Sequence, residues 1–241
     1  MATIKDILNS TDNRSYPLPD RPWKYYQEWH GVLMLHYRVE QSYLEKLLPE
    51  GLYPDTFDGS AWVSLLAFSV KKLRPKFMPP LPYISSFNEI NLRTYVIKDG
   101  VPGIYMLIIE ADKLPDVIIP RWFLGIPYVK ADMKRQSGHF MSKNATWNRN
   151  LEVEFKYTTP AGSKPLLDTW LTERHALYVK RNKRLYRFDI HYKEWKLKDA
   201  IITGIKQNYT LGITTGVRPD RQHYSKITKV VIWGRKVVHK Y

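Results

Sequence analysis

The sequence predicts a mainly β protein (α+β by content), in which antiparallel strands form a closed barrel or a sandwich with two or three short helices. Three observations support this fold class. Apolar residues make up 44% and aromatic residues 14% of the 241 residues, which is enough for a large packed core. Most apolar segments are strand-like in periodicity, and turn-forming residues separate them at short intervals. No internal repeat, low-complexity tract or linker divides the chain.

The predicted elements follow one another along the whole chain. Strands are expected at residues 31–39, 60–73, 87–98, 102–111, 128–134, 139–143, 151–157, 176–180, 185–192, 200–206 and 227–238. Short helices are expected at 41–48 and 166–173, with one or two helical turns at 115–124. Four prolines between 75 and 82 predict a surface loop, because proline cannot donate to a sheet. We expect one domain at 21–241, preceded by an extension at 1–20.

Several classes of site are excluded by absent motifs. The chain has no cysteine, so disulfides, thiolate metal sites and a cysteine nucleophile are excluded. The sequence lacks a glycine-rich phosphate loop, an H-E-x-x-H pair and a G-x-S-x-G elbow. We therefore expect no metal and no organic cofactor. No apolar run is long enough to span a membrane, and the charged N-terminus is unlike a secretory signal, so a cytoplasmic protein is expected.

Positive charge is concentrated in the C-terminal part of the chain. The net charge is +15, and residues 151–241 hold 19 Lys and Arg against 8 Asp and Glu. The densest run is Lys180-Arg181-Asn182-Lys183-Arg184, between two strand-like segments. It is interpreted either as a solvated hairpin turn or as an anion-binding surface. The turn is favoured because no nucleic-acid-binding motif accompanies the run, so nucleic acid is an improbable partner.

The most informative segment is Phe87-Asn-Glu-Ile-Asn-Leu-Arg-Thr-Tyr95. Alternation along a strand places Glu89, Asn91 and Arg93 on one face with Phe87 and Tyr95. The other face carries Ile90, Leu92 and Val96 with Thr94. Periodicity alone favours a polar face in water. The alternative is that the polar row points into a barrel and binds a small polar ligand.

Three further groups are candidates. Tyr128 and Lys130 share a face if residue 128 begins a strand, and a desolvated lysine there could act as an imine-forming nucleophile. Glu173 and Arg174 are adjacent opposite charges in an apolar frame, which indicates either a buried structural ion pair or a ligand contact. His36, on a strand, is interpreted as a structural histidine or a ligand contact.

A set of short motifs runs in order along the chain: Arg21-Pro-Trp23, Trp29-His30, His36, Leu48-Pro-Glu-Gly-Leu52, Asp55–Trp62, Phe87–Tyr95, Gly125-Ile-Pro-Tyr128, Leu171-Thr-Glu-Arg174, Ile190-His191, Trp195 and His223-Tyr-Ser225. Taken together, these landmarks resemble the YqjF-like family of uncharacterised bacterial proteins over about residues 20–233. That family is similar to the acetoacetate decarboxylase superfamily. The resemblance implies a large antiparallel β barrel around a ligand cavity, and it favours the inward orientation of the Glu89 row.

The superfamily's reactive lysine lies in a Gly-Phe-Pro-Lys-Lys motif, and its cavity glutamate follows an aromatic-x-Glu pattern. Phe87-Asn88-Glu89 matches the glutamate pattern. Gly125-Ile126-Pro127 matches the start of the lysine motif, but Tyr128 and Val129 replace both lysines. The parent imine mechanism is therefore not expected, although Lys130 could be a displaced substitute.

The sequence thus predicts an enclosed cavity for a small carbonyl- or carboxylate-bearing ligand. Acid/base chemistry would use Glu89, Arg93 and Tyr128, and the expected ligand contacts are Asn91, Lys130, Glu173, Arg174 and His36. The alternatives are a non-catalytic binding protein that uses the same cavity and an adaptor for anions that uses the basic C-terminal region.

Overall fold

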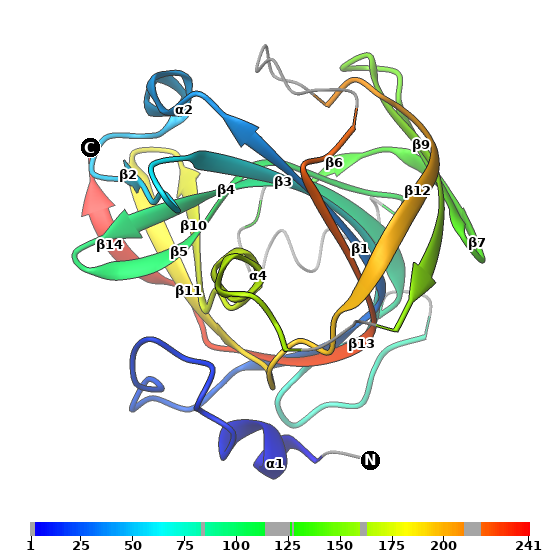
Figure 1. Cartoon of the computed structure of the whole chain (residues 1–241). Helices are drawn as coiled ribbons and strands as arrows, with labels where there is room; N and C mark the ends of the chain where they lie inside the picture. The colour runs from blue at the N-terminus through cyan, green and yellow to red at the C-terminus, as the bar shows by residue number, and fades with distance from the viewer. Residues whose placement is uncertain (1–2, 83–84, 114–125, 127, 160–162, 210–217) are drawn as a thin grey trace.

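Strands pair side by side into a closed ring in the computed structural model (Figure 1). The structure describes residues 3–82, 85–113, 126, 128–159, 163–209 and 218–241. Within these residues the ring runs in the order β13, β1, β3, β4, β5, β10, β11, and pairing of Ile190 with Ile232 closes it. The ring strands are β1 (Tyr25–Val39), β3 (Ala61–Pro75), β4 (Phe87–Lys98), β5 (Val101–Ala111), β10 (Ala176–Arg181), β11 (Arg184–His191) and β13 (Arg221–Ile232).

The mainly β, barrel-like class predicted from the sequence is confirmed, with one difference in pairing. Every neighbouring pair in the ring is antiparallel except β5 and β10, which run parallel. The described helices are short: α1 (Ile4–Leu8), α2 (Gln41–Leu47) and α4 (Leu166–Thr172). Helix α4 covers one end of the ring, and its Leu171 belongs to the interior core (Figure 1).

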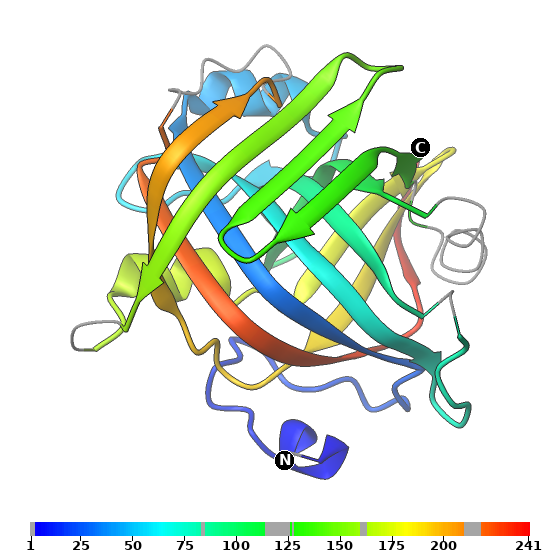
Figure 2. The same ribbon diagram turned by 90° about the vertical axis from the view of Figure 1, so that its right-hand side faces the viewer.

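A second layer of strands extends from β13 and covers part of the ring from outside. It consists of β12 (Lys198–Gln207), β9 (Arg149–Thr158), β8 (His139–Asn144) and β7 (Asp132–Gln136). Figure 2 shows this layer in front of β1 and β3. Two short strands, β2 (Tyr53–Pro54) and β6 (Val129–Lys130), pair with β4 and β5, and β14 (Lys236–Lys240) pairs with β11.

The central ring strands are therefore buried on both faces. Leu66 and Phe68 of β3 belong to the core inside the ring, whereas Leu65 and Ala67 belong to the core between the ring and the outer layer. Alternate residues of one strand thus serve two separate cores, which is why these strands are apolar almost throughout.

Some predicted boundaries need correction. The strand expected at 227–238 is two strands, β13 and β14, because the chain leaves the sheet at Trp233-Gly234-Arg235. The strand expected at 128–134 is divided into β6 and β7 at Ala131. The helical turns expected at 115–124 lie outside the described residues. No helix among the described residues is long and apolar enough to cross a membrane.

The first residues of the chain pack onto the ring. Ile7 of α1 is 1% exposed and lies in a cluster with Tyr26, Val231 and Trp233. The main-chain oxygen of Ile7 also lies 2.9 Å from Nε2 of His191. The N-terminal segment is therefore anchored to β1, β11 and β13.

Replacing Gly103 with alanine is expected to destabilise the fold by about 2 kcal/mol, because the parallel contact between β5 and β10 leaves no room for a side chain. A Cβ atom at Gly103 would lie 2.6 Å from the oxygen of Ala176 and 2.7 Å from Tyr178. Thermal unfolding measures the loss. Gly204→Ala is the control, since its nearest contact would be 3.5 Å, and equal losses for the two variants would contradict the expectation.

Candidate functional site

A cavity of about 50 Å³ lies inside the ring, and most of its lining is apolar. Its polar lining residues are Gln27, Trp29, Glu89, Asn91, Arg93 and Tyr128. Glu89, Asn91 and Arg93 are 4%, 2% and 5% exposed, so the polar row of β4 faces the interior. The opposite face of β4, with Ile90 and Leu92, packs under the outer layer.

Glu89 is held by two donors inside the cavity. The Asn91 side-chain amide and the Tyr128 hydroxyl each donate to its carboxylate at 2.8 Å. Burial raises the pKa of Glu89 to about 7, against the opposing effects of these hydrogen bonds and of Arg93. Burial and the neighbouring Glu89 raise the pKa of Tyr128 well above its usual value. Glu89 can therefore hold or release a proton near neutral pH.

Arg93 is a buried cation without an ion-pair partner among the described residues. Its Nε atom makes no hydrogen bond, and the same holds for Trp29 Nε1 and Asn91 Oδ1. All three atoms belong to residues that line the cavity. Buried polar groups without partners are rare in folded proteins, so their gathering around one cavity calls for an explanation.

A bulge in β1 directs Trp29 into this cavity. Gly31 has a positive φ of 58°, and the pairing of β1 with β3 shifts register between His30 and Leu33. The bulge reverses the alternation, so that both Trp29 and Val32 line the cavity although three positions separate them. Glycine is needed here because other residues rarely adopt this conformation.

His36 is fully buried next to the cavity, but it is not among the lining residues. Its Nδ1 atom lies 2.6 Å from Oγ of Ser64, and its Nε2 atom lies 3.1 Å from Nδ1 of His223. Burial, followed by the nearby His223 and Arg93, lowers the pKa of His36 well below its usual value. The structure thus places His36 in a polar network behind the cavity wall.

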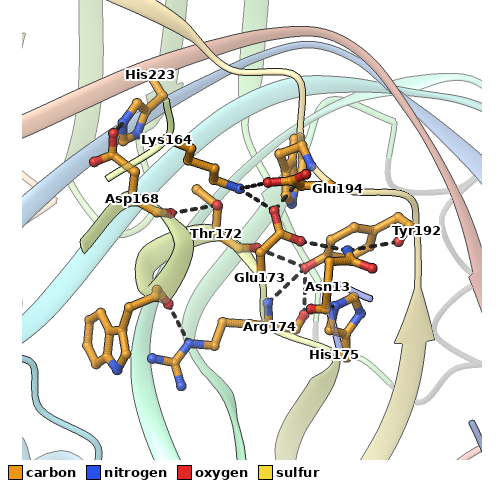
Figure 3. Close-up of polar contacts among 12 residues, drawn as sticks. Asn13, Lys164, Asp168, Thr172, Glu173, Arg174, His175, Tyr192, Glu194 and His223 are labelled. Atoms are coloured by element: carbon orange, nitrogen blue, oxygen red, sulfur yellow. Dashed lines mark hydrogen bonds and ion pairs between the residues drawn. The ribbon is translucent and has the colours of Figure 1, made fainter. Parts of the chain in front are cut away.

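Glu173 and Arg174 lie at the end of α4 (Figure 3), and neither is among the residues that line the cavity. Glu173 forms an ion pair with Lys164 and accepts hydrogen bonds from the Asn13 side chain at 2.8 Å and the Trp195 main chain at 3.1 Å. Arg174 pairs with Asp55 and donates to the Trp170 carbonyl at 2.7 Å. These contacts bind the N-terminal segment and α4 to the ring, as expected for a structural junction.

Sequence comparisons show the family of this chain. A model of the DUF2071 family, described as an uncharacterized conserved protein, matches residues 26–229. The chain belongs to this family. It is 35% identical over 229 residues to "Uncharacterized protein YqjF" of Bacillus subtilis (strain 168), with 91% of this chain and 95% of the relative covered. The resemblance to the YqjF-like family is therefore confirmed.

The fold of this DUF2071 member is similar to solved acetoacetate decarboxylase-like structures. An acetoacetate decarboxylase-like enzyme from Sphingomonas wittichii RW1 superposes with a TM-score of 0.61 at 15% identity, covering 92% of this chain and 95% of that one. The enduracididine biosynthesis enzyme MppR, complexed with the condensation product of pyruvate and imidazole 4-carboxaldehyde, gives 0.62 at 13% identity, covering 94% and 93%. At this identity the likeness shows the fold alone.

Lys130 lies on the surface of this DUF2071 member. The sequence predicts that Tyr128 and Lys130 share a strand face, and this is wrong because β6 begins only at Val129. The Tyr128 amide, just before the strand, donates to the Ile126 carbonyl at 3.0 Å. Tyr128 is therefore buried against Glu89, whereas Lys130 is exposed. Gly125 and Pro127 of the motif lie outside the described residues.

Sequence reasoning missed several polar residues around the site. Trp29 depends on the bulge. Ser64, Asp168 and His223 come together only through pairing of distant strands and through α4. The available signal was Trp29-His30-Gly31, since glycine within a strand often marks a bulge. The basic run lies in the β10–β11 hairpin, where Asn182 has a φ of 53° typical of a tight turn.

Proposed function

We propose that this DUF2071 member binds a small carboxylate- or carbonyl-bearing molecule in the ring cavity, with Arg93 holding its negative end. The observation that carries this proposal is the set of buried polar atoms around the cavity that lack a protein partner. Arg93 Nε and Trp29 Nε1 are donors, and Asn91 Oδ1 is an acceptor. A ligand with an acidic group and a second polar atom would satisfy them, and the guanidinium is well shaped for a carboxylate.

The size of the cavity limits the ligand. A water-sized group needs roughly 10–15 Å³ on this measure, so about 50 Å³ accommodates only a few such groups. This favours compounds of the size of acetate, pyruvate or acetoacetate over nucleotides or sugars. The apolar remainder of the lining, which includes Phe68, Ile109 and Phe188, suits a short hydrocarbon portion.

Glu89 and Tyr128 supply an acid/base pair beside the bound molecule. With a pKa of about 7, Glu89 is available in both protonation states, which suits transfer of a proton at the carbon next to a carbonyl group. No lysine lines the cavity among the described residues, and residues 114–125 and 127 contain none. Imine chemistry is therefore not part of the proposal. The pyruvate-derived ligand of MppR supports a carbonyl compound as the ligand class.

Arg93→Met is expected to abolish binding of small carboxylates while the fold is retained. We expect at least a tenfold loss of affinity, because a charge-assisted hydrogen bond is typically worth about 1.5–3 kcal/mol. The thermal midpoint should stay unchanged or rise, since methionine removes a buried unpaired charge. Calorimetric titration with acetate, pyruvate and acetoacetate measures the affinity.

The matched control is Arg38→Met, which changes an exposed arginine on β1 and should leave affinity unchanged. Wild-type affinity in the Arg93 variant, or no saturable binding of any compound by the natural protein, would contradict the proposal. Deuterium exchange into the methyl group of pyruvate, followed by NMR, separates an enzyme from a binding protein. The acid/base proposal requires exchange that Glu89→Gln removes.

A further inference from the structure

A continuous row of polar side chains runs from a surface groove to Arg93. The groove, of about 450 Å³, lies beside α4, and its lining includes Asp168, Arg221 and His223. The row then continues inward through buried residues contributed by four neighbouring ring strands, β13, β1, β3 and β4. In order, its members are Asp168, His223, His36, Ser64 and Tyr95, and all but Asp168 are 1% exposed or less.

Each link in this row is a short polar contact. His223 Nε2 lies 3.1 Å from Oδ2 of Asp168 in a bent contact (Figure 3). His223 Nδ1 lies 3.1 Å from Nε2 of His36. Ser64 Oγ lies 2.6 Å from His36 Nδ1 and 2.6 Å from the Tyr95 hydroxyl. Strand register explains the order, because Ser64 pairs with His36 on one side and with Arg93 on the other.

The charge of Asp168 determines which partner donates in each hydrogen bond of this row. Arg221 donates to both of its carboxylate oxygens, at 2.9 and 2.6 Å. Although burial opposes ionisation, hydrogen bonds from His223 and Arg221 hold the pKa of Asp168 well below its usual range. An ionised carboxylate only accepts hydrogen bonds, so its charge favours a proton on the facing Nε2 of His223, although the bent contact at 3.1 Å falls outside hydrogen-bond geometry.

One arrangement of protons then connects every link from Tyr95 to Asp168, and it leaves the Leu171 carbonyl without the Tyr95 proton. His223 donates through Nε2 to Asp168 and accepts at Nδ1 from Nε2 of His36. His36 in turn accepts at Nδ1 from the Ser64 hydroxyl, and Ser64 accepts from Tyr95. In this arrangement every proton in the row points toward Asp168.

Tyr95 follows Arg93 by two positions on β4, so the two buried side chains share a face and the row ends beside the guanidinium. Burial raises the pKa of Tyr95, and the charge of Arg93, together with hydrogen bonding to Ser64 and Arg93, opposes this increase. A Tyr95 hydroxyl that donates to Ser64 presents its oxygen lone pairs to Arg93. The competing acceptor for the Tyr95 proton is the Leu171 carbonyl at 3.0 Å, and the reversed arrangement would use it.

We propose that Asp168, His223, His36, Ser64 and Tyr95 form a positioning chain that orients Arg93 toward the anion in the cavity, which rests on the function proposed above. The charge of Asp168 fixes the direction of the chain. Tyr95 then acts on the ligand through Arg93, and a group at the surface groove affects binding inside the ring.

The direction of the chain is tested without any ligand. Long-range nitrogen–proton NMR of labelled histidine identifies which ring nitrogen carries the proton. We expect His36 and His223 to be protonated at Nε2 in the natural protein. In Asp168→Asn the new amide can donate to His223, so we expect both rings to change to protonation at Nδ1. Protonation at Nδ1 in the natural protein, or no change in the variant, would overturn the proposed direction.

The effect on Arg93 is tested by pyruvate affinity. Ser64→Ala interrupts the chain, and affinity is expected to fall roughly threefold to tenfold, the effect of one lost hydrogen bond. Ser64→Thr keeps the hydroxyl and should restore affinity, which loss of packing alone would not allow. Ser69→Ala is the control, because Ser69 lies on the same strand and donates to Asn88 at 2.7 Å, outside the chain.

The outcomes separate this inference from the proposed function. Natural affinity in Ser64→Ala, together with loss in Arg93→Met, would refute the positioning chain and leave the cavity proposal intact. Natural affinity in Arg93→Met would refute the cavity proposal, whatever the histidine protonation shows. If Asp168→Asn fails to fold, the Ser64→Ala and Ser64→Thr pair still decides the matter.

Discussion

Replacing Glu110 with alanine is expected to lower the free energy of unfolding by about 3 kcal/mol, because it removes one partner of a buried charged network. Glu110 on β5 is fully buried and accepts hydrogen bonds from Asn144 at 2.8 Å, Arg149 at 3.1 Å and Tyr209 at 2.7 Å. Its removal leaves a cation, an amide and a phenol without their acceptor. Since the Arg149 side chain is 17% exposed and can recruit water, the expected loss is at the lower end for such networks.

Urea denaturation measures this loss. If the slope of the unfolding free energy against urea concentration is unchanged, the unfolding transitions of the variant and the natural protein can be compared directly. Glu110→Gln should lose less, since its amide oxygen can still accept. Glu154→Ala on β9 is the control, because that side chain is exposed and surface changes usually stay within about 0.5 kcal/mol. A loss for Glu110→Ala no larger than this control would mean that Glu110 does not hold the ring to its outer layer.

The polar row of β4 shows how far the sequence determines the site. Alternation correctly separates Glu89, Asn91 and Arg93 from Ile90 and Leu92. It cannot say which face is inside, because here both faces are buried, one by the ring core and one by the core under the outer layer. Periodicity alone favours the solvent reading, and the family resemblance favours the inward orientation that the structure shows.

Other features depend on local irregularity or on distant pairing. The Gly31 bulge sends Trp29 inward, and Tyr128 precedes the first residue of β6, so it does not share a strand face with Lys130. A strict two-residue period describes neither, because it holds only along an unbroken strand. The contact of His36 with His223 depends on the register between β1 and β13, far apart in sequence, which no local pattern encodes.

Replacing Glu89 with glutamine is expected to remove the part of the pH dependence of folding stability that Glu89 contributes. The pKa of Glu89 is about 7 in the fold, above the ordinary value of 4.5 that applies to the unfolded chain. The folded protein therefore binds this proton more tightly, and the stability it contributes is present below pH 4.5 and lost as pH rises through 7. The pKa of Glu89 differs by about 2.5 units between the folded and the unfolded chain. At about 1.4 kcal/mol per unit, this corresponds to about 3 kcal/mol of folding stability.

Glutamine has no proton to lose, so the variant does not lose this stability as the pH rises. Its free energy of unfolding, relative to that of the natural protein, should therefore increase by about 3 kcal/mol between pH 4 and pH 8.5. The new amide also finds an acceptor, because Asn91 Oδ1 has no partner and that side chain can rotate toward it. Chemical denaturation of both proteins across this range gives the difference in unfolding free energy, in which the contributions of all other titrating groups cancel.

Tyr128→Phe removes a hydrogen bond that lowers the pKa of Glu89, so it should move the pH at which stability is lost to a higher value. A difference that is flat with pH would show that Glu89 is ionised in the fold as readily as in the unfolded chain, and the acid/base role would lose its basis.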